Sequence, residues 1–312
     1  MNLKKVVIAL ALACGAAHAS AMTVNADYSQ LGTVYQNLSG MLSNTHSTGA
    51  TDVTSLFQYN TQTALNYWSN AVLLPLTTTI TFKLGDLSSR SAAGTSIIDT
   101  TDANGRPLTT TIIVDNTATS LFLDTTPTDN SEFNIASVNA TLGGGSVNIS
   151  RFGAANTTAA SGGYDFLTLI LHEAEHSLGF SSGTQRFDNV INATGDMLEI
   201  SSSLSGLPAS FGVAVSGTHI DGIADNGFFN NTSLALPGFN AGERALLSGV
   251  DILAVCQIQG CTSSQINLDP SATVSPVPEP TSWAMMILGL ATVIGFGRRR
   301  ARPAPNNALM SA

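Results

Sequence analysis

Two histidines and a glutamate occur at a spacing that suits metal chemistry. The stretch LTLILHEAEHSLGF, from Leu167 to Phe180, contains His172, Glu173 and His176. Residues four apart lie one above the other on a helix face, so the two imidazoles would point the same way. Glu173 is one residue further round and would lie beside a metal ion rather than on it. The pattern predicts a zinc-peptidase site in which Glu173 is the general base toward a zinc-activated water.

A zinc site of this kind needs a third protein ligand, which the stretch itself does not supply. Metzincins place a histidine three residues after the glycine that ends the helix, but Gly179 is followed at that distance by Ser182, a poor zinc ligand. His219, in the segment SGTHIDGIADNG, is the first candidate because zinc prefers imidazole. A later acidic residue, Asp188 or Glu199, is the alternative.

The N-terminal residues 1–21 have the order of a secretory signal peptide. Two lysines precede an apolar run from Val6 to Cys14, and the small residues AHA end at Ala19. The run is too short to span a bilayer, so we expect export and removal of this segment. Lipoprotein processing at Cys14 is the rival interpretation.

The C-terminal residues 276–312 carry a second signal. Pro-Glu-Pro at 278–280 precedes an apolar stretch, 283–297, that is at the short limit for a membrane helix, and arginines follow at 298–300. This order resembles the PEP-CTERM sorting signal of Gram-negative bacteria. The resemblance implies an exosortase-type sorting enzyme as partner, membrane attachment through the helix before processing, and a final location in the cell envelope, on the outer surface or in the extracellular matrix. An ordinary C-terminal membrane anchor is the alternative.

Between the signals lies an acidic domain, residues 22–275. Its net charge is about −14, because half of the 12 basic residues lie in the two ends. Nucleic acid and anionic membranes need a basic face, so neither is expected as a partner. Cys256 and Cys261 are the domain's two cysteines, and in an oxidising compartment they favour a disulfide.

Hydrophobic periodicity predicts an α+β fold with a mixed sheet, an active-site helix and a C-terminal helix. Residues 181–217 are rich in Ser, Gly and Asn, which predicts a loop-like segment with short helices. The expected helices are 51–74, 164–178 and the segment LSGVDILAVCQI (247–258), where Ser248 and Asp251 form a start signal; the expected strands are 76–85, 106–115 and a pair within 133–153.

Three segments together resemble a family of exported bacterial zinc metalloproteases with PEP-CTERM tails. They are HEAEHSLGFSSG, THIDG and LSGVDILAVCQIQG, in this order. The resemblance implies a zincin-like fold, His172 and His176 as zinc ligands, Glu173 as the catalytic base and His219 as the third ligand.

The sequence departs from that family's pattern at two places. Ile220 stands where an aromatic residue is common, and the segment NGFFNN (226–231) lacks the methionine often found after the third histidine. The second departure puts in doubt a methionine turn beneath the metal.

The sequence thus favours a secreted or envelope zinc-dependent endopeptidase that hydrolyses a peptide or protein substrate. The alternative is a PEP-CTERM-sorted surface or matrix protein with a structural or vestigial zinc site. Three further expectations concern the surroundings: Glu175 is a solvated helix residue, Tyr164 is structural, and the strand at 143–153 is an edge along which a peptide lies.

Overall fold

The computed structural model describes residues 21–90, 92–182, 184–222 and 240–272. The predicted signal peptide except for its last residue, Ala21, the NGFFNN segment and the predicted membrane helix at 283–297 lie outside these ranges. Chain contacts divide the protein into two compact units, Met1–Thr273 and Val274–Ala312, and every described residue belongs to the first. Within the described ranges, no helix combines the length and apolar character needed to cross a membrane.

The main sheet has four strands in the order β1-β5-β7-β6. β1 (Thr23–Asp27), β5 (Thr77–Gly85) and β7 (Pro107–Asp115) are parallel, and β6 (Gly94–Thr101) runs antiparallel at the edge. The predictions of β5, β7 and a mixed sheet are confirmed. The sequence did not reveal β6, because most of its side chains are polar and only Gly94 at its start is buried, so it lacks the alternation of a half-buried strand.

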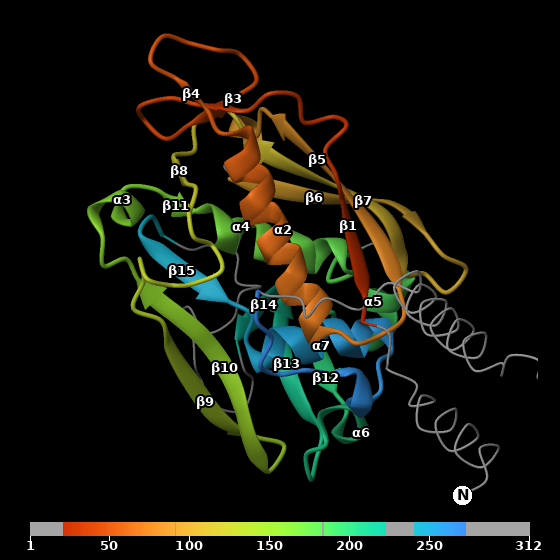
Figure 1. Cartoon of the computed structure of the whole chain (residues 1–312). Helices are drawn as coiled ribbons and strands as arrows, with labels where there is room; N and C mark the ends of the chain where they lie inside the picture. The colour runs from red at the N-terminus through yellow and green to blue at the C-terminus, as the bar shows by residue number, and fades with distance from the viewer. Residues whose placement is uncertain (1–20, 91, 183, 223–239, 273–312) are drawn as a thin grey trace, which may run out of the picture. The chain divides into compact units, whose positions relative to one another are not determined.

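Two long helices pack beside this sheet and on each other (Figure 1). α2 (Thr54–Ala71) lies within the predicted helix 51–74, and α4 (Phe166–Ser177) carries the histidine pair. The indole Nε1 of Trp68 donates a buried hydrogen bond of 3.0 Å to the carbonyl of Leu171. This bond joins α2 to the turn of α4 that precedes His172.

α4 starts two residues later than the sequence predicts. Tyr164 and Asp165 form the short strand β11, which pairs in parallel with β8 (Leu121–Phe122). Asp165 then caps the helix, because its carboxylate accepts a hydrogen bond from Thr168 N. Strand pairing in the preceding residues therefore sets where the helix begins.

The second sheet, which has three strands, contains the segment predicted as an edge strand. β10 (Gly145–Ala154) forms a hairpin with β9 (Ala136–Leu142), as expected for this region, and pairs on its other side with β15 (Glu243–Leu246). β10 is therefore the central strand, and the expectation that 143–153 forms a free edge is wrong.

The segment after α4 is more ordered than its composition suggests. Residues 181–217 contain two short helices, α5 (Gln185–Val190) and α6 (Ser202–Ser205), as expected, but also two strands that were not predicted from the sequence. Buried apolar residues alternate in β12 (Met197–Ile200) and β13 (Phe211–Ser216). These two strands pair with each other, and β13 also pairs with β14 (His219–Gly222).

The remaining elements are β2 (Tyr35–Gln36), β3 (Leu42–Ser43), β4 (Thr51–Asp52), α3 (Thr158–Ser161), and the 3-10 turns η1 (Ser88–Arg90) and η2 (Ser263–Gln265).

The predicted C-terminal helix is α7 (Gly249–Gln259). Ser248 and Asp251 form the expected capping box, and Gly260 ends the helix in a left-handed conformation. Cys256 lies in the last turn of α7 and Cys261 lies just after the helix. Both are free thiols, in place of the expected disulfide. The thiol of Cys256 is hydrogen-bonded to Cys261 and is buried, and both effects raise its pKa.

Candidate metal centre

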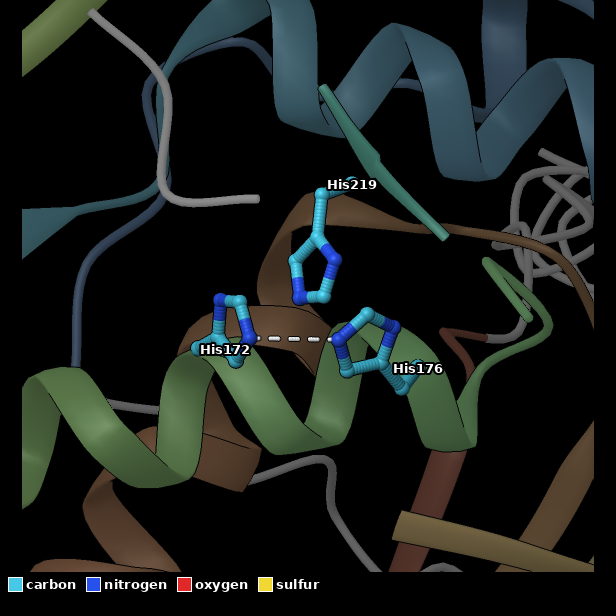
Figure 2. Close-up of side chains that lie close together, drawn as sticks. All are labelled: His172, His176 and His219. Atoms are coloured by element: carbon cyan, nitrogen blue, oxygen red, sulfur yellow. Dashed lines mark hydrogen bonds between the residues drawn. The ribbon is translucent and has the colours of Figure 1, made fainter. Parts of the chain in front are cut away.

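The centre is built on two histidines from one face of α4. His172 and His176 lie one helical turn apart, and their Nε2 atoms are 3.1 Å from each other (Figure 2). Both rings are largely buried. Ligand nitrogens of a tetrahedral zinc lie roughly 3.3 Å apart, given zinc–nitrogen bonds of about 2.0–2.1 Å, so the spacing of the pair suits a shared ion.

His219 reaches the same point from β14. Its ring stacks on His172 with centroids 5.3 Å apart and meets His176 nearly at a right angle with centroids 5.0 Å apart. One ring nitrogen from each of the three histidines lies within 4.8 Å of the others. Figure 2 shows His219 pointing from the hairpin toward the space between the two helix histidines.

The end of α4 fixes the proton on His176. Gly179 has a φ of 108°, which lets the chain turn back so that the Phe180 carbonyl meets Nδ1 of His176 at 2.7 Å. A carbonyl only accepts hydrogen bonds, so Nδ1 carries the proton and Nε2 presents its lone pair. This arrangement, with the outer nitrogen bound to a carbonyl, is the usual support of a metal-ligating histidine.

The surroundings favour neutral imidazoles. Burial lowers the pKa of His176 to about 4, with a smaller contribution from the nearby His219 and an opposing one from the hydrogen bond to Phe180. Burial likewise lowers the pKa of His219. Metal ions bind the deprotonated ring, so these two side chains are in the ligating form at neutral pH.

Glu173 lies against the edge strand beside the histidines. Its side chain is only 5% exposed, and its Oε2 has no hydrogen-bond partner among the described residues. Burial raises the pKa of this carboxyl to about 8. A Cβ on Gly94 of β6 would lie 2.9 Å from the Oε1 atom of Glu173, so a larger residue here would force the carboxyl or the strand to shift.

The other candidate ligands lie outside this cluster. Asp188 is exposed on α5, and Glu199 is exposed on β12. Neither belongs to the group of converging side chains found among the described residues. Ser182, at the position of the metzincin histidine, is exposed as well.

A cavity of about 780 Å³ opens over the centre. Three segments that the sequence did not assign to the site form much of its wall: the η1 turn with the residues after it, the start of β6, and the loop that follows β7. Tyr164, expected to be structural, also lines the cavity and is 36% exposed. No local pattern marked these segments, because they reach the histidines only through the packing of α4 against β6 and β7.

Glu175 differs from its expected solvated position. Its side chain is fully buried, and neither carboxyl oxygen has a hydrogen-bond partner in the described part of the chain. Burial and the nearby Asp251 raise its pKa well above the ordinary value. It faces away from the cavity wall, since the residues that line the cavity include Glu173 but not Glu175.

A buried ion network holds the start of α4. Arg244 of β15 donates to both carboxylate oxygens of Asp165, at 2.7 and 3.0 Å, and to Asp124 at 2.7 Å. All three side chains are fully buried. Because Asp165 is also the N-cap of α4, the network connects the second sheet to the helix that carries the histidines.

Comparison with known proteins identifies the tail of the chain. Residues 276–301 match a family model described as the PEP-CTERM protein-sorting motif. The match confirms the predicted sorting signal and indicates an exported, envelope-associated protein recognised by an exosortase-type sorting enzyme. No curated protein matches the chain significantly. The matched residues all follow the folded domain, so they give no information on its chemistry.

Proposed function

We propose that the domain is an exported zinc-dependent endopeptidase that hydrolyses peptide bonds with Glu173 as general base. One observation carries the proposal: three imidazole nitrogens from two separate elements lie within 4.8 Å of one another at the wall of an open cavity. Beside them is a buried carboxyl, one oxygen of which has no partner in the part of the chain that the structure describes. The proposal explains why these polar side chains are buried together, because burying polar atoms without partners costs free energy.

The donor set fits zinc. Three histidines with one coordination position left open form a known catalytic zinc arrangement, and His176 already carries the proton distribution of a ligand. His172, His176 and His219 would hold the ion. When bound, zinc would polarise the substrate carbonyl and lower the pKa of a coordinated water.

Glu173 would accept the proton of the attacking water and later donate it. Its pKa of about 8 in the buried setting lies near neutrality, where a group both accepts and returns a proton readily. The free Oε2 atom is the position at which the proton would be held and then passed to the leaving amine. A cation bound by the neighbouring histidines would favour the carboxylate form and so prepare Glu173 to accept the proton.

The substrate would lie along β6. This strand pairs only with β7 in the described sheet, so its other edge is free to accept an extended peptide by backbone hydrogen bonds. Gly94, Thr95 and Ser96 of β6 line the cavity. β6 thus takes the role that the sequence suggested for 143–153.

Metal analysis combined with a casein cleavage assay tests the proposal. The expected result is about one zinc per chain and proteolysis that the Glu173→Gln variant loses while it retains zinc. A loss of activity of at least roughly a hundredfold is expected for removal of a general base. Full activity of Glu173→Gln would rule out the assigned mechanism. Zinc without proteolysis in the wild type would favour a surface or matrix protein with a structural zinc site.

The ligand set is tested by substitution. His219→Ala should lower the zinc content sharply, because a zinc site with two protein ligands is weak. Asp188→Asn and Glu199→Gln are matched controls, since each removes the charge of a rival ligand from an exposed position. If His219→Ala kept its zinc content and one of the control variants lost zinc, the acidic residue replaced in that control would be the third ligand.

A further inference from the structure

The basic residues of the acidic domain are few, and nearly all the arginines are committed to structural contacts. Arg244 is buried between two aspartates, and Arg151 pairs with Asp269. Arg186 donates to the carbonyls of Asn104 and Ile258, and Arg106 donates to the carbonyl of Gln259. Each of these four side chains is thus engaged in a contact within the fold.

Arg90 differs from them. It is exposed at the end of η1, and the one hydrogen bond that its guanidinium makes among the described residues is to Oγ1 of Thr95, at a long 3.3 Å. The ion pairs found in the described structure involve other arginines, and the hydrogen-bonding capacity of Arg90 is otherwise unused. An arginine has five donors, so at least one full face of this guanidinium is free for a carboxylate.

Arg90 also lines the cavity over the histidines. The other charged groups on this wall are accounted for: Asp115 is buried and accepts hydrogen bonds from Leu87, Thr117, Ala118 and Thr119, and Glu173 is the proposed base. Arg90 is therefore the one exposed, formally charged side chain among the described residues of the cavity wall.

The geometry of β6 relates Arg90 to a bound peptide. Gly94 and Ser96 lie on the face toward α4, where a Cβ on Gly94 would meet Glu173 and the hydroxyl of Ser96 is hydrogen-bonded to that of Ser177 at 2.7 Å. Thr95, between them, faces the opposite side of the sheet, where it holds Arg90. A peptide paired with this edge would alternate in the same way, so a residue next to the one facing the histidines would direct its side chain toward Arg90.

We infer that Arg90 binds a substrate carboxylate at a position adjacent to the bond that is cleaved, which gives the site a preference for acidic peptides. The inference rests on the proposed function. The carboxylate has two possible sources, the side chain of Asp or Glu and the free C-terminus of a short peptide. Both fit a planar guanidinium, and they differ in whether amidation of the C-terminus matters.

Cleavage of internally quenched decapeptide pools measures this preference. In each pool one position carries Glu, Gln or Lys and the others are mixed, and each pool is made with a free and an amidated C-terminus. We expect kcat/KM to favour Glu over Gln by about tenfold at one position in the wild type. Arg90→Gln should reduce this ratio to about one, and Arg90→Glu should shift the preference to Lys. A free C-terminus as the source would give a preference that amidation abolishes.

Two variants control for general charge. Arg151→Gln removes the same group from an ion pair on β10, outside the cavity wall. Lys83→Gln removes the basic residue of β5, which lies two strands from Thr95 on the same sheet face. Both should keep the Glu preference of the wild type. If Lys83→Gln lost the Glu preference as fully as Arg90→Gln, the preference would come from the general electrostatic field and not from contact with Arg90. That result would overturn the inference.

Binding separates failure of this inference from failure of the proposed function. Fluorescence anisotropy of the same peptides with zinc-loaded Glu173→Gln protein, with and without Arg90→Gln, needs no turnover. Cleavage without any Glu preference would overturn the role of Arg90 and leave the peptidase intact. Absence of cleavage together with Arg90-dependent binding of Glu peptides would overturn the peptidase and leave the carboxylate site.

Discussion

Gly94 has no side chain at the point where β6 passes over Glu173. An added Cβ would lie 2.9 Å from Oε1 and 3.0 Å from Cγ of that glutamate, and 3.0 Å from Leu169. Either the strand or the carboxyl would have to move. We therefore read Gly94 as a positioning residue for the proposed base, because displacements well under 1 Å already weaken proton transfer.

Gly94→Ala should lower kcat by roughly tenfold while zinc content and KM change little. Gly162→Ala is the matched control: Gly162 lies at the end of α3, and its added Cβ would meet only atoms at 3.9 Å or more. Steady-state kinetics with parallel zinc analysis checks the prediction. A variant as active as the wild type would show that Glu173 tolerates the contact and that Gly94 has no positioning role.

The buried position of Glu175 lowers the stability of the folded protein. Its carboxyl is fully buried and has no hydrogen-bond partner within the described ranges, so it loses its hydration without compensation there. Glu175→Met, which keeps the length of the side chain, should raise the free energy of unfolding by about 1–3 kcal/mol. Urea unfolding measures the change. A decrease in stability would indicate that the carboxyl has a stabilising partner in solution.

At the scale of elements, α4 depends on an ion network at its first turn. Asp165 caps the helix and shares Arg244 with Asp124, all in a fully buried setting. Asp165→Ala should cost about 3–5 kcal/mol of unfolding free energy, because it leaves Arg244 with a single buried counter-charge. Asp269→Ala breaks an exposed pair instead and should cost less than about 1 kcal/mol. Chemical unfolding of both variants compares them directly, and equal costs would contradict the role of the network.

The loops at the carboxyl ends of β5 and β7 depend on Asp115. Burial acts to raise the pKa of this side chain, but hydrogen bonds from Thr117, Ala118 and Thr119 outweigh it, so the pKa lies well below its ordinary value. A lowered pKa in the folded state stabilises the protein above the unfolded value of about 3.9, and this contribution is lost as the pH falls below it.

Asp115→Asn should therefore destabilise the protein more at pH 7 than at pH 3. At pH 7 the change removes a carboxylate acceptor and costs about 1–3 kcal/mol; at pH 3 the wild type has itself begun to lose the same contribution. Unfolding free energies at the two pH values test this, with the exposed Asp188→Asn as control. A cost independent of pH would refute the assignment.

For the whole domain, zinc would join elements that are far apart in sequence. His219 belongs to the sheet β12-β13-β14, whereas the other two histidines belong to α4. An ion that binds only the folded protein stabilises it by about 4 kcal/mol at a thousand times its dissociation constant. Chelation should therefore lower the Tm of the wild type and of Glu173→Gln, but not that of His219→Ala. An unchanged Tm after removal of bound zinc would show that the ion is not coupled to folding.

The sequence by itself determined the features that depend on neighbouring residues. The H-E-x-x-H spacing placed two imidazoles on one helix face, and the capping box at Ser248 marked α7. The order of residues in 276–301 identified the sorting signal. Strands β5 and β7 were predictable because their apolar residues face a core, and that produces a pattern within the strand itself.

Only the tertiary structure decided what surrounds these residues. It brought His219 to the histidine pair, put the polar edge strand β6 against Glu173 and buried Glu175. The sequence suggested a different edge strand and a solvated Glu175. The reason is physical: helix spacing and caps are set within a few residues, whereas an edge strand and the burial of a single carboxyl depend on segments that meet only after the chain has folded.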